Sequence, residues 1–306
     1  MSHLHPTERP APPGPDPGRT DLLVRRSARL AVDDIDFGAF AACPLDADAL
    51  RCLRYMHDVE SHTICYLRDL LVTAAHRDPH VTAFLACWSY EEHWHGDAIG
   101  RVLAAHGEAA GTSRAAALRL TLPRRDRLRP LLFSLGSALS PHVVAVHMAW
   151  GAVNEWTTQA GYGRLAARAG HPVLAELLRR IMKQEGRHID FYTAEACRRL
   201  DASAGARRLC RVALQRAWGP VGSGIMPAQE VAIVARYLFG GDAGRAAACR
   251  VDRQIDRMSG LQGLHLVERA VGAASRRARS RPVPAAGLSD RASGRASRNR
   301  AMAASS

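Results

Sequence analysis

The feature that most constrains the fold of this chain is a helical spacing of apolar residues in four long segments. These segments are residues 45–76, 80–106, 140–169 and 171–200. Apolar side chains recur in them every three or four positions, which is the period of an α-helix with one buried face. Shorter helices are expected at 21–32, 204–218, 227–239 and 242–273. Because no segment alternates apolar and polar residues as a half-buried strand does, the sequence predicts an all-α fold.

Side chains that can bind metals lie on the apolar faces of these four helices. The second and fourth helices each contain a Glu-x-x-His unit, and the first and third each carry one glutamate in line with their apolar residues. Residues three apart on a helix project from the same face, so the Glu and His of one unit can bind the same metal ion. The six side chains are Glu60, Glu92, His95, Glu155, Glu185 and His188.

This pattern favours a metal site over a solvated helix surface. A carboxylate in a bundle core is costly unless it is paired or bound to a metal. The spacing also repeats, since 32 residues separate Glu60 from Glu92 and 30 separate Glu155 from Glu185. The same ligand set forms the di-iron or di-manganese site of ferritin-like bundles. We therefore predict a ferritin-like four-helix bundle with additional helices that binds two Fe²⁺ ions, with manganese left open and a polar-cored structural bundle as the alternative.

Three segments resemble the soluble acyl-[acyl-carrier-protein] desaturases. Residues 91–97, EEHWHGD, are similar to the EENRHGD segment of that family. Residues 185–188, EGRH, resemble its EKRHE motif, and residues 154–158, NEWTT, resemble its QERAT segment. The resemblance covers roughly residues 45–200, and a weaker similarity follows at 253–256. Its most specific part is the doubled glutamate with the trailing His-Gly.

The resemblance implies an O₂-dependent di-iron enzyme that introduces a double bond into a fatty acyl chain bound to acyl carrier protein. It also implies a ferredoxin-type electron donor and a homodimer. Thr158 matches the position of a catalytic hydroxyl associated with oxygen activation. Gln184 departs from the family, because many members carry there an acid that orients a ligand histidine. An amide can accept that hydrogen bond but supplies no negative charge.

Other functions stay open at the level of the sequence. A di-iron oxygenase of the same fold that acts on another substrate would use the same six ligands. A ribonucleotide reductase small subunit fits less well, because Glu60 and Ile99 stand where it has Asp and a radical Tyr. From a different class, the Arg-rich C-terminus could bind nucleic acid through the phosphates. That segment lacks interleaved aromatic residues and any recognisable nucleic-acid motif, which disfavours nucleic-acid binding as the function.

Charge and composition divide the chain into three parts. Residues 1–20 contain six prolines and are expected to be a disordered lead, and residues 21–273 are expected to be the helical domain. The net charge is +13, and residues 274–306 hold eight arginines and one acid, or +7 of that total. This last part is expected to be a disordered tail. An acidic carrier protein would be attracted by basic residues such as those between 124 and 129.

Cysteine usage and hydropathy suggest a compartment. The seven cysteines are scattered and never form a Cys-x-x-Cys pair, which is typical of reduced thiols in an intracellular protein. The N-terminus lacks the apolar core of a signal peptide, and no run of about 18 apolar residues occurs. We therefore expect a cytoplasmic protein without a membrane span.

Overall fold

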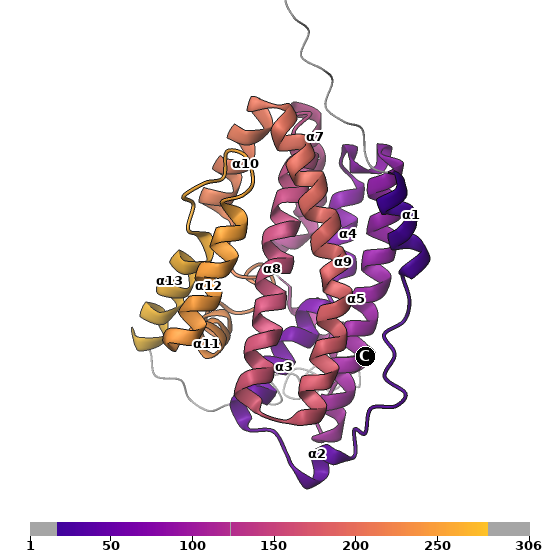
Figure 1. Ribbon diagram of the computed structural model, residues 1–306, viewed down its shortest axis with the longest axis vertical. Helices are drawn as coiled ribbons and strands as arrows, with labels where there is room; N and C mark the ends of the chain where they lie inside the picture. The colour runs from indigo at the N-terminus through magenta and orange to yellow at the C-terminus, as the bar shows by residue number, and fades with distance from the viewer. Residues whose placement is uncertain (1–16, 123, 281–306) are drawn as a thin grey trace, which may run out of the picture.

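The computed structural model describes residues 17–122 and 124–280, and all regular structure in these ranges is helical. The predicted all-α fold is therefore confirmed. Long helices form a central bundle (Figure 1). Its first position is occupied by two consecutive helices, and each of the other three is occupied by a single helix. They are α3 (Ala47–Glu60) with α4 (Thr63–Leu71), α5 (Pro79–Ala105), α8 (Val143–Ala169) and α9 (Pro172–Ala202).

Shorter helices cover the bundle on opposite sides (Figure 1). Helices α10 to α13 form a layer beside α8, and α1 lies against α5 on the other side. The covering layer contains α10 (Ala204–Ala217), α11 (Ala228–Phe239), α12 (Gly241–Ile255) and α13 (Leu266–Ser280). The remaining elements are α1 (Pro17–Arg26), α2 (Ala39–Ala42), η1 (Ala74–Arg77), α6 (Gly111–Thr121), η2 (Arg124–Leu128) and α7 (Arg129–Leu139).

Local sequence signals set the ends of the long helices. The Asp78 carboxylate accepts hydrogen bonds from the backbone of His80 and Val81 at the start of α5, which satisfies amides that have no partner within the helix. At the other ends, Gly107 follows α5 with φ 73° and Gly170 follows α8 with φ 61°. This left-handed conformation is accessible to glycine without a steric penalty, so these glycines stop the helices.

The first long helix is interrupted, contrary to the prediction of one helix over 45–76. The chain turns at Ser61 and His62, between α3 and α4. The Ser61 carbonyl accepts a hydrogen bond from Arg119 on α6 at 2.9 Å, and the amide of Cys65 donates to the His62 carbonyl at 2.8 Å. The Ser61 carbonyl would accept the next hydrogen bond of a continuing helix. It bonds instead to a side chain that is distant in the sequence. Glu60 becomes the last residue of α3.

The segment predicted as one helix over 242–273 is two helices, α12 and α13. The intervening turn contains Gly260 and Gly263, whose φ angles are 83° and 70°. The Asp252 carboxylate of α12 accepts hydrogen bonds from the amides of Val267 and Glu268 at the start of α13. An aspartate that caps the following helix stabilises its free N-terminal amides. The interruption is therefore a turn between two packed helices, and the two glycines and the Asp252 cap stabilise it.

The helical domain extends slightly beyond the predicted range of 21–273. Helix α1 begins at Pro17, and α13 continues to Ser280. The rest of the predicted lead (1–20) and tail (274–306) lies outside the described residues. None of the helices in the described ranges is long and apolar enough to cross a membrane.

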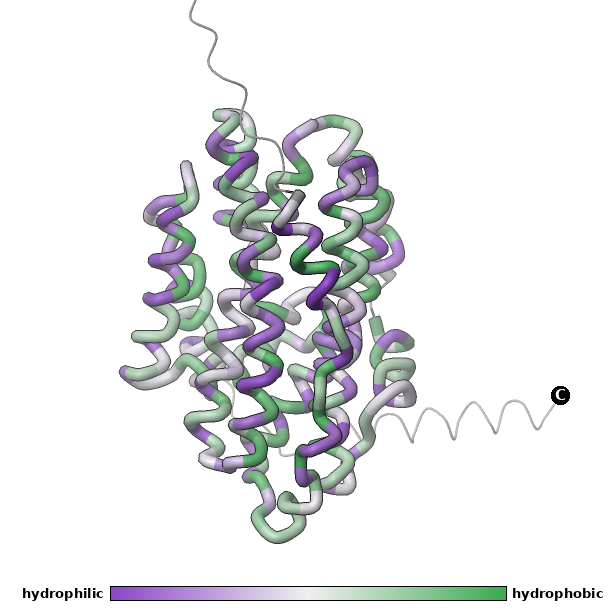
Figure 2. The backbone as a smooth tube through the Cα atoms, turned by 45° about the vertical axis from the view of Figure 1, so that its right-hand side comes forward, coloured by the Kyte–Doolittle hydropathy of each residue, from purple (hydrophilic) through white to green (hydrophobic). Residues whose placement is uncertain are grey.

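The core lies between the long helices. Figure 2 shows hydrophobic and hydrophilic residues alternating along the helices, as amphipathic helices require. Phe84 on α5 stacks on Phe191 of α9 with ring centroids 4.0 Å apart. The Tyr192 ring meets the Phe84 ring edge-on, with centroids 4.7 Å apart. Gly151 of α8 leaves room for Tyr192, because a Cβ there would lie 2.3 Å from the Tyr192 ring. This packing brings the buried faces of α5, α8 and α9 together inside the bundle.

Candidate metal centre

The six sequence-predicted ligands converge inside the bundle in two overlapping groups. Each group contains four residues whose ligating atoms all lie within 4.8 Å of one another. The first group is Glu60, Glu92, His95 and Glu185, and the second is Glu92, Glu155, Glu185 and His188. All six side chains are buried. Because the two groups share Glu92 and Glu185, these two carboxylates lie between two adjacent positions that could each hold a metal ion.

Both imidazoles turn Nδ1 toward the shared carboxylates. His188 Nδ1 lies 3.0 Å from Glu185 Oε2 and 3.3 Å from Glu92 Oε1. His95 Nδ1 lies 3.4 Å from Glu185 Oε1 and 3.5 Å from Glu92 Oε2. Each histidine therefore faces one oxygen of both carboxylates, so the arrangement is nearly symmetric about the centre.

The outer nitrogen of each histidine bonds to the residue that precedes the glutamate of the opposite Glu-x-x-His unit. His188 Nε2 lies 2.8 Å from Glu91 Oε2, and His95 Nε2 lies 2.9 Å from Gln184 Oε1. Such partners fix the ring orientation and keep Nδ1 directed at a metal. The expectation that Gln184 accepts a bond from a ligand histidine is thus confirmed at the level of contact. The symmetry is broken chemically, because one partner is a carboxylate and the other an amide.

One backbone segment holds both of these partners. The amide of Ala28 donates to Glu91 Oε1 at 3.2 Å, and its carbonyl accepts from Gln184 Nε2 at 3.0 Å. Arg187 also donates to Glu91 at 2.6 Å. The chain that follows α1 therefore positions the two residues that orient the histidines.

The two unshared glutamates are held by aromatic donors. The Tyr162 hydroxyl donates a short hydrogen bond to Glu60 Oε1. The Trp88 indole donates to Glu155 Oε1 at 3.0 Å. Each bond occupies one carboxylate oxygen and leaves the other to face the centre, which suits a terminal ligand that binds through a single oxygen.

The centre concentrates negative charge in a buried region. Burial raises the pKa of Glu60 well above its ordinary value, and the charge of Glu92 raises it further. Burial, with the charges of Glu185 and Glu92, does the same to the pKa of Glu155. Burial alone would lower the pKa of His95, but the adjacent carboxylates of Glu185 and Glu92 raise it to about 9. The centre thus retains protons that a divalent cation would displace.

The donor set fits divalent iron or manganese. His95 Nδ1 and Glu185 Oε1 are buried and make no hydrogen bond in the described structure, although a buried polar atom without a partner is costly. A cation between them would satisfy both atoms. Four carboxylates neutralise two divalent cations, and two imidazoles complete a ligand set of mixed hardness. All six predicted metal-ligating residues are therefore in place, whereas the identity and number of ions remain predictions.

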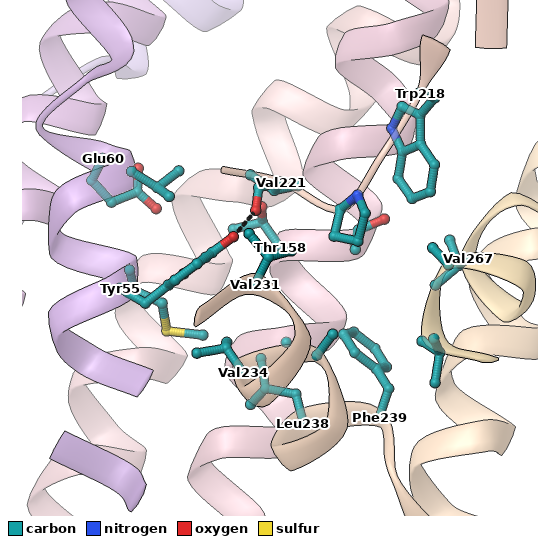
Figure 3. A pocket seen from close by; sticks show the side chains of 18 residues that line it. Tyr55, Glu60, Thr158, Trp218, Val221, Val231, Val234, Leu238, Phe239 and Val267 are labelled. Atoms are coloured by element: carbon teal, nitrogen blue, oxygen red, sulfur yellow. Dashed lines mark hydrogen bonds between the residues drawn. The ribbon is translucent and has the colours of Figure 1, made fainter. Parts of the chain in front are cut away.

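An apolar pocket adjoins the centre on the side of α11 and α13 (Figure 3). About 650 Å³ of space, part of it open to solvent, lies between its walls. In Figure 3, Glu60 lies at one end of the pocket and Val267 at the other. Val231, Val234 and Leu238 of α11 contribute apolar wall. An apolar pocket that reaches a buried ligand cluster is a place where a small molecule can bind next to that cluster.

Thr158 lines this pocket and does not belong to the two ligand groups. Its neighbour Thr157 also lines the pocket, but the Thr157 hydroxyl donates to the Val153 carbonyl at 2.7 Å. Thr158 thus lies in the pocket wall on α8, the helix that carries Glu155. Its catalytic role stays a prediction.

A glycine-rich loop between α10 and α11 closes one side of the pocket. The Tyr55 hydroxyl donates a short hydrogen bond to the Val221 carbonyl, drawn as a dashed line in Figure 3. Gly222 follows with φ 89°, and a Cβ there would lie 2.4 Å from the Tyr55 hydroxyl. The Trp218 indole donates to Asn154 Oδ1 at 3.0 Å. The loop is thus fastened to both α3 and α8.

The sequence reasoning missed three residues that support the centre. Glu91, Trp88 and Tyr162 each bond directly to a predicted ligand, and none of them was predicted to do so. Glu91 had a signal, since it stands immediately before Glu92, as Gln184 stands before Glu185. Trp88 and Tyr162 had none beyond their place on apolar faces, because core packing alone explains an aromatic residue there.

Comparison with protein-family models, with curated proteins and with solved structures finds no match for this chain.

Proposed function

We propose that this protein is an O₂-dependent di-iron oxidoreductase that desaturates a fatty acyl chain carried by acyl carrier protein. The observation that carries the proposal is the pair of overlapping ligand groups beside an apolar pocket that contains Glu60 in its wall. A structural polar core would not need an adjoining cavity. A di-iron centre, when bound, supplies the O₂ activation that removal of hydrogen from an unactivated methylene requires.

Three groups of residues, namely the ligands, the aromatic donors and the pocket walls, would have separate roles in the reaction. The six ligands would hold the ions, and Glu92 and Glu185, which belong to both ligand groups, would contribute to both positions. Tyr162 and Trp88 orient the unshared glutamates, and the apolar walls exclude water from the substrate. In the overall reaction the acyl chain loses two hydrogen atoms. Dioxygen takes them up with two electrons and two protons to give two water molecules, and the electrons come from a ferredoxin-type donor.

The substrate and partners rest on the resemblance together with the pocket. The pocket walls offer almost no hydrogen-bonding groups, which suits an aliphatic chain and disfavours a sugar or a nucleotide. A carrier protein would stay outside while its acyl chain enters. The homodimer and the cytoplasmic location stay expectations from the sequence.

The test uses the full chain reconstituted with iron, a ferredoxin and its reductase, and acyl-[acyl-carrier-protein] as substrate. We expect mass spectrometry of the acyl chain to show the loss of two hydrogens. A hydroxylated chain would instead support the alternative, a di-iron oxygenase of the same fold. If the iron-loaded protein consumes O₂ and yields neither product, the acyl substrate is wrong. If it binds no iron, the centre itself is wrong.

A matched pair of variants separates the centre from the fold. Glu92→Ala removes a shared carboxylate and should abolish activity. Val212→Ser changes an exposed side chain on α10, away from the centre, and should leave activity unchanged. Activity in the Glu92 variant would contradict the proposal.

A further inference from the structure

Helix α7 and the residue before it direct a row of leucines away from the protein. Five leucine side chains here are between 55% and 77% exposed, namely Leu128, Leu131, Leu132, Leu135 and Leu139. At 3.6 residues per turn, the four within the helix lie in an arc of about 100°. Single exposed apolar residues are ordinary, but a contiguous exposed patch marks an interaction surface. We call these five residues the leucine face.

The opposite side of α7 is attached to the bundle. The Phe133 ring stacks on the His147 ring of α8 with centroids 5.2 Å apart and an angle of 10° between the planes. The Ser137 hydroxyl accepts a hydrogen bond from the amide of Ala74 at 2.8 Å. These contacts set the rotation of the helix about its axis. The outward direction of the leucines is therefore a property of the folded chain.

Positive charge adjoins the leucine face. The preceding turn η2 contains Arg124, Arg125 and Arg127, and Arg127 is exposed. The only acid of this turn, Asp126, is buried and lies 3.5 Å from Arg68 of α4. Because this acid is directed inward, the exposed Arg127 supplies positive charge beside Leu128, at the start of the leucine face. Apolar side chains beside arginines match the acyl chains and headgroups of an anionic bilayer.

We propose that the leucine face docks this protein on the surface of an anionic lipid bilayer. The leucines would enter the boundary between headgroups and acyl chains, and Arg127 of η2 would contact the phosphates. This docking does not depend on the reaction proposed for the metal centre. No residue of α7 lines the pocket beside that centre, so the leucine face is a separate surface.

Size and charge favour a bilayer over a second copy of the chain. Helix α7 has 11 residues, which gives a length of about 16 Å. A face one helix wide and this long falls well below the roughly 800 Å² that each partner buries in a standard interface. An anionic bilayer would also attract the exposed Arg127 beside the leucines, whereas Arg127 of a second copy would repel it.

Vesicle flotation with the full-length protein tests this proposal. We expect binding to vesicles of phosphatidylcholine and phosphatidylglycerol in equal parts, weaker binding to phosphatidylcholine alone, and weaker binding at high salt. The double variant L131S/L135S should bind the mixed vesicles at least about tenfold more weakly, because two apolar anchors are lost. The C-terminal arginines are present in every variant, so their attraction to lipid cancels in this comparison.

The matched control is the double variant L22S/V24S on α1, whose side chains are 48% and 45% exposed. It should bind as the unchanged protein does. Circular dichroism should give the same melting curve for both double variants, since the replaced side chains are not in the core. Equal binding by L131S/L135S and the unchanged protein would overturn the proposal. A leucine-dependent dimer in sedimentation velocity without lipid, with no vesicle binding, would overturn it in favour of a second copy.

Discussion

His188 of α9 is joined to Glu91 of α5 through its Nε2 atom, at 2.8 Å. The corresponding nitrogen of His95 meets the amide of Gln184 instead, at 2.9 Å. Burial alone would raise the pKa of Glu91, but hydrogen bonds from His188 and Arg187 hold it below its ordinary value. Glu91 therefore stays ionised and increases the basicity of His188 as a ligand. The two halves of the centre differ in charge although their geometry is nearly the same.

Replacing this carboxylate by an amide should weaken one half of the centre. In Glu91→Gln we expect the affinity for one of two ions to fall about 10- to 100-fold, as for other outer partners of metal-bound histidines. Chelator competition with Fe²⁺ or Mn²⁺ measures the two affinities. The reciprocal variant Gln184→Glu is the control and should tighten binding at the His95 half. Equal affinities in all three proteins would show that these contacts do not tune the metals.

The shared and unshared glutamates should differ in the number of ions lost. Glu185 belongs to both ligand groups, whereas Glu155 belongs to one. Glu185→Gln keeps the side-chain size but removes the charge between the two positions, so we expect loss of both ions. Glu155→Gln should retain about one ion per chain. Metal analysis after reconstitution gives the stoichiometry, and identical losses would contradict the shared arrangement.

The chain around Ala28 should matter for metal binding although it contains none of the six ligands. Its backbone bonds to both Glu91 and Gln184. Deletion of residues 1–28 should therefore lower the metal affinity by about tenfold. Deletion of residues 1–16 keeps α1 and Ala28 and should change nothing. Circular dichroism checks that the shorter chain is folded, and unaltered affinity in the longer deletion would remove the segment from the centre.

Acid should destabilise the protein through His147. Burial lowers the pKa of this histidine from 6.5 to about 4. The unfolded chain binds the proton more tightly, so the contribution of His147 to stability is complete above pH 6.5 and is lost as the pH falls toward 4. The loss is on the order of 3 kcal/mol at the acid limit. His147→Phe should unfold with a shallower pH dependence in this window, measured by urea denaturation, and an unchanged slope would contradict the assignment.

Gly222 should tolerate no side chain. Its φ of 89° and the 2.4 Å distance from a Cβ to the Tyr55 hydroxyl both oppose substitution. Gly222→Ala should lower the free energy of unfolding by about 1–3 kcal/mol. Gly163→Ala on α8 is the control, because its Cβ would meet only Met182 at 3.8 Å, and removing a helical glycine should stabilise by about 0.5–1 kcal/mol. Urea unfolding of both variants checks the opposite signs.

The sequence predicted well which Glu and His side chains meet in the buried clusters, because their signal is local. Periodicity of 3.6 residues places Glu92 with His95 and Glu185 with His188 on single helix faces, whatever the rest of the chain does. Helix ends with strong capping signals were also predictable, as at Gly107 and Gly170. The interruption after Glu60 was not, because its cause is a bond to Arg119, 58 positions away in the sequence.

By itself, the sequence determined that the chain is helical and which six side chains can bind metal, since both follow from spacing along single helices. Only the tertiary structure decided which histidine each orienting residue contacts. Glu91 and His188 are 97 positions apart, and Gln184 and His95 are 89 apart. Such pairs form only when α5 and α9 pack at one fixed register and rotation. The pocket beside Glu60 and the exposure of the leucine face depend in the same way on how separate helices pack.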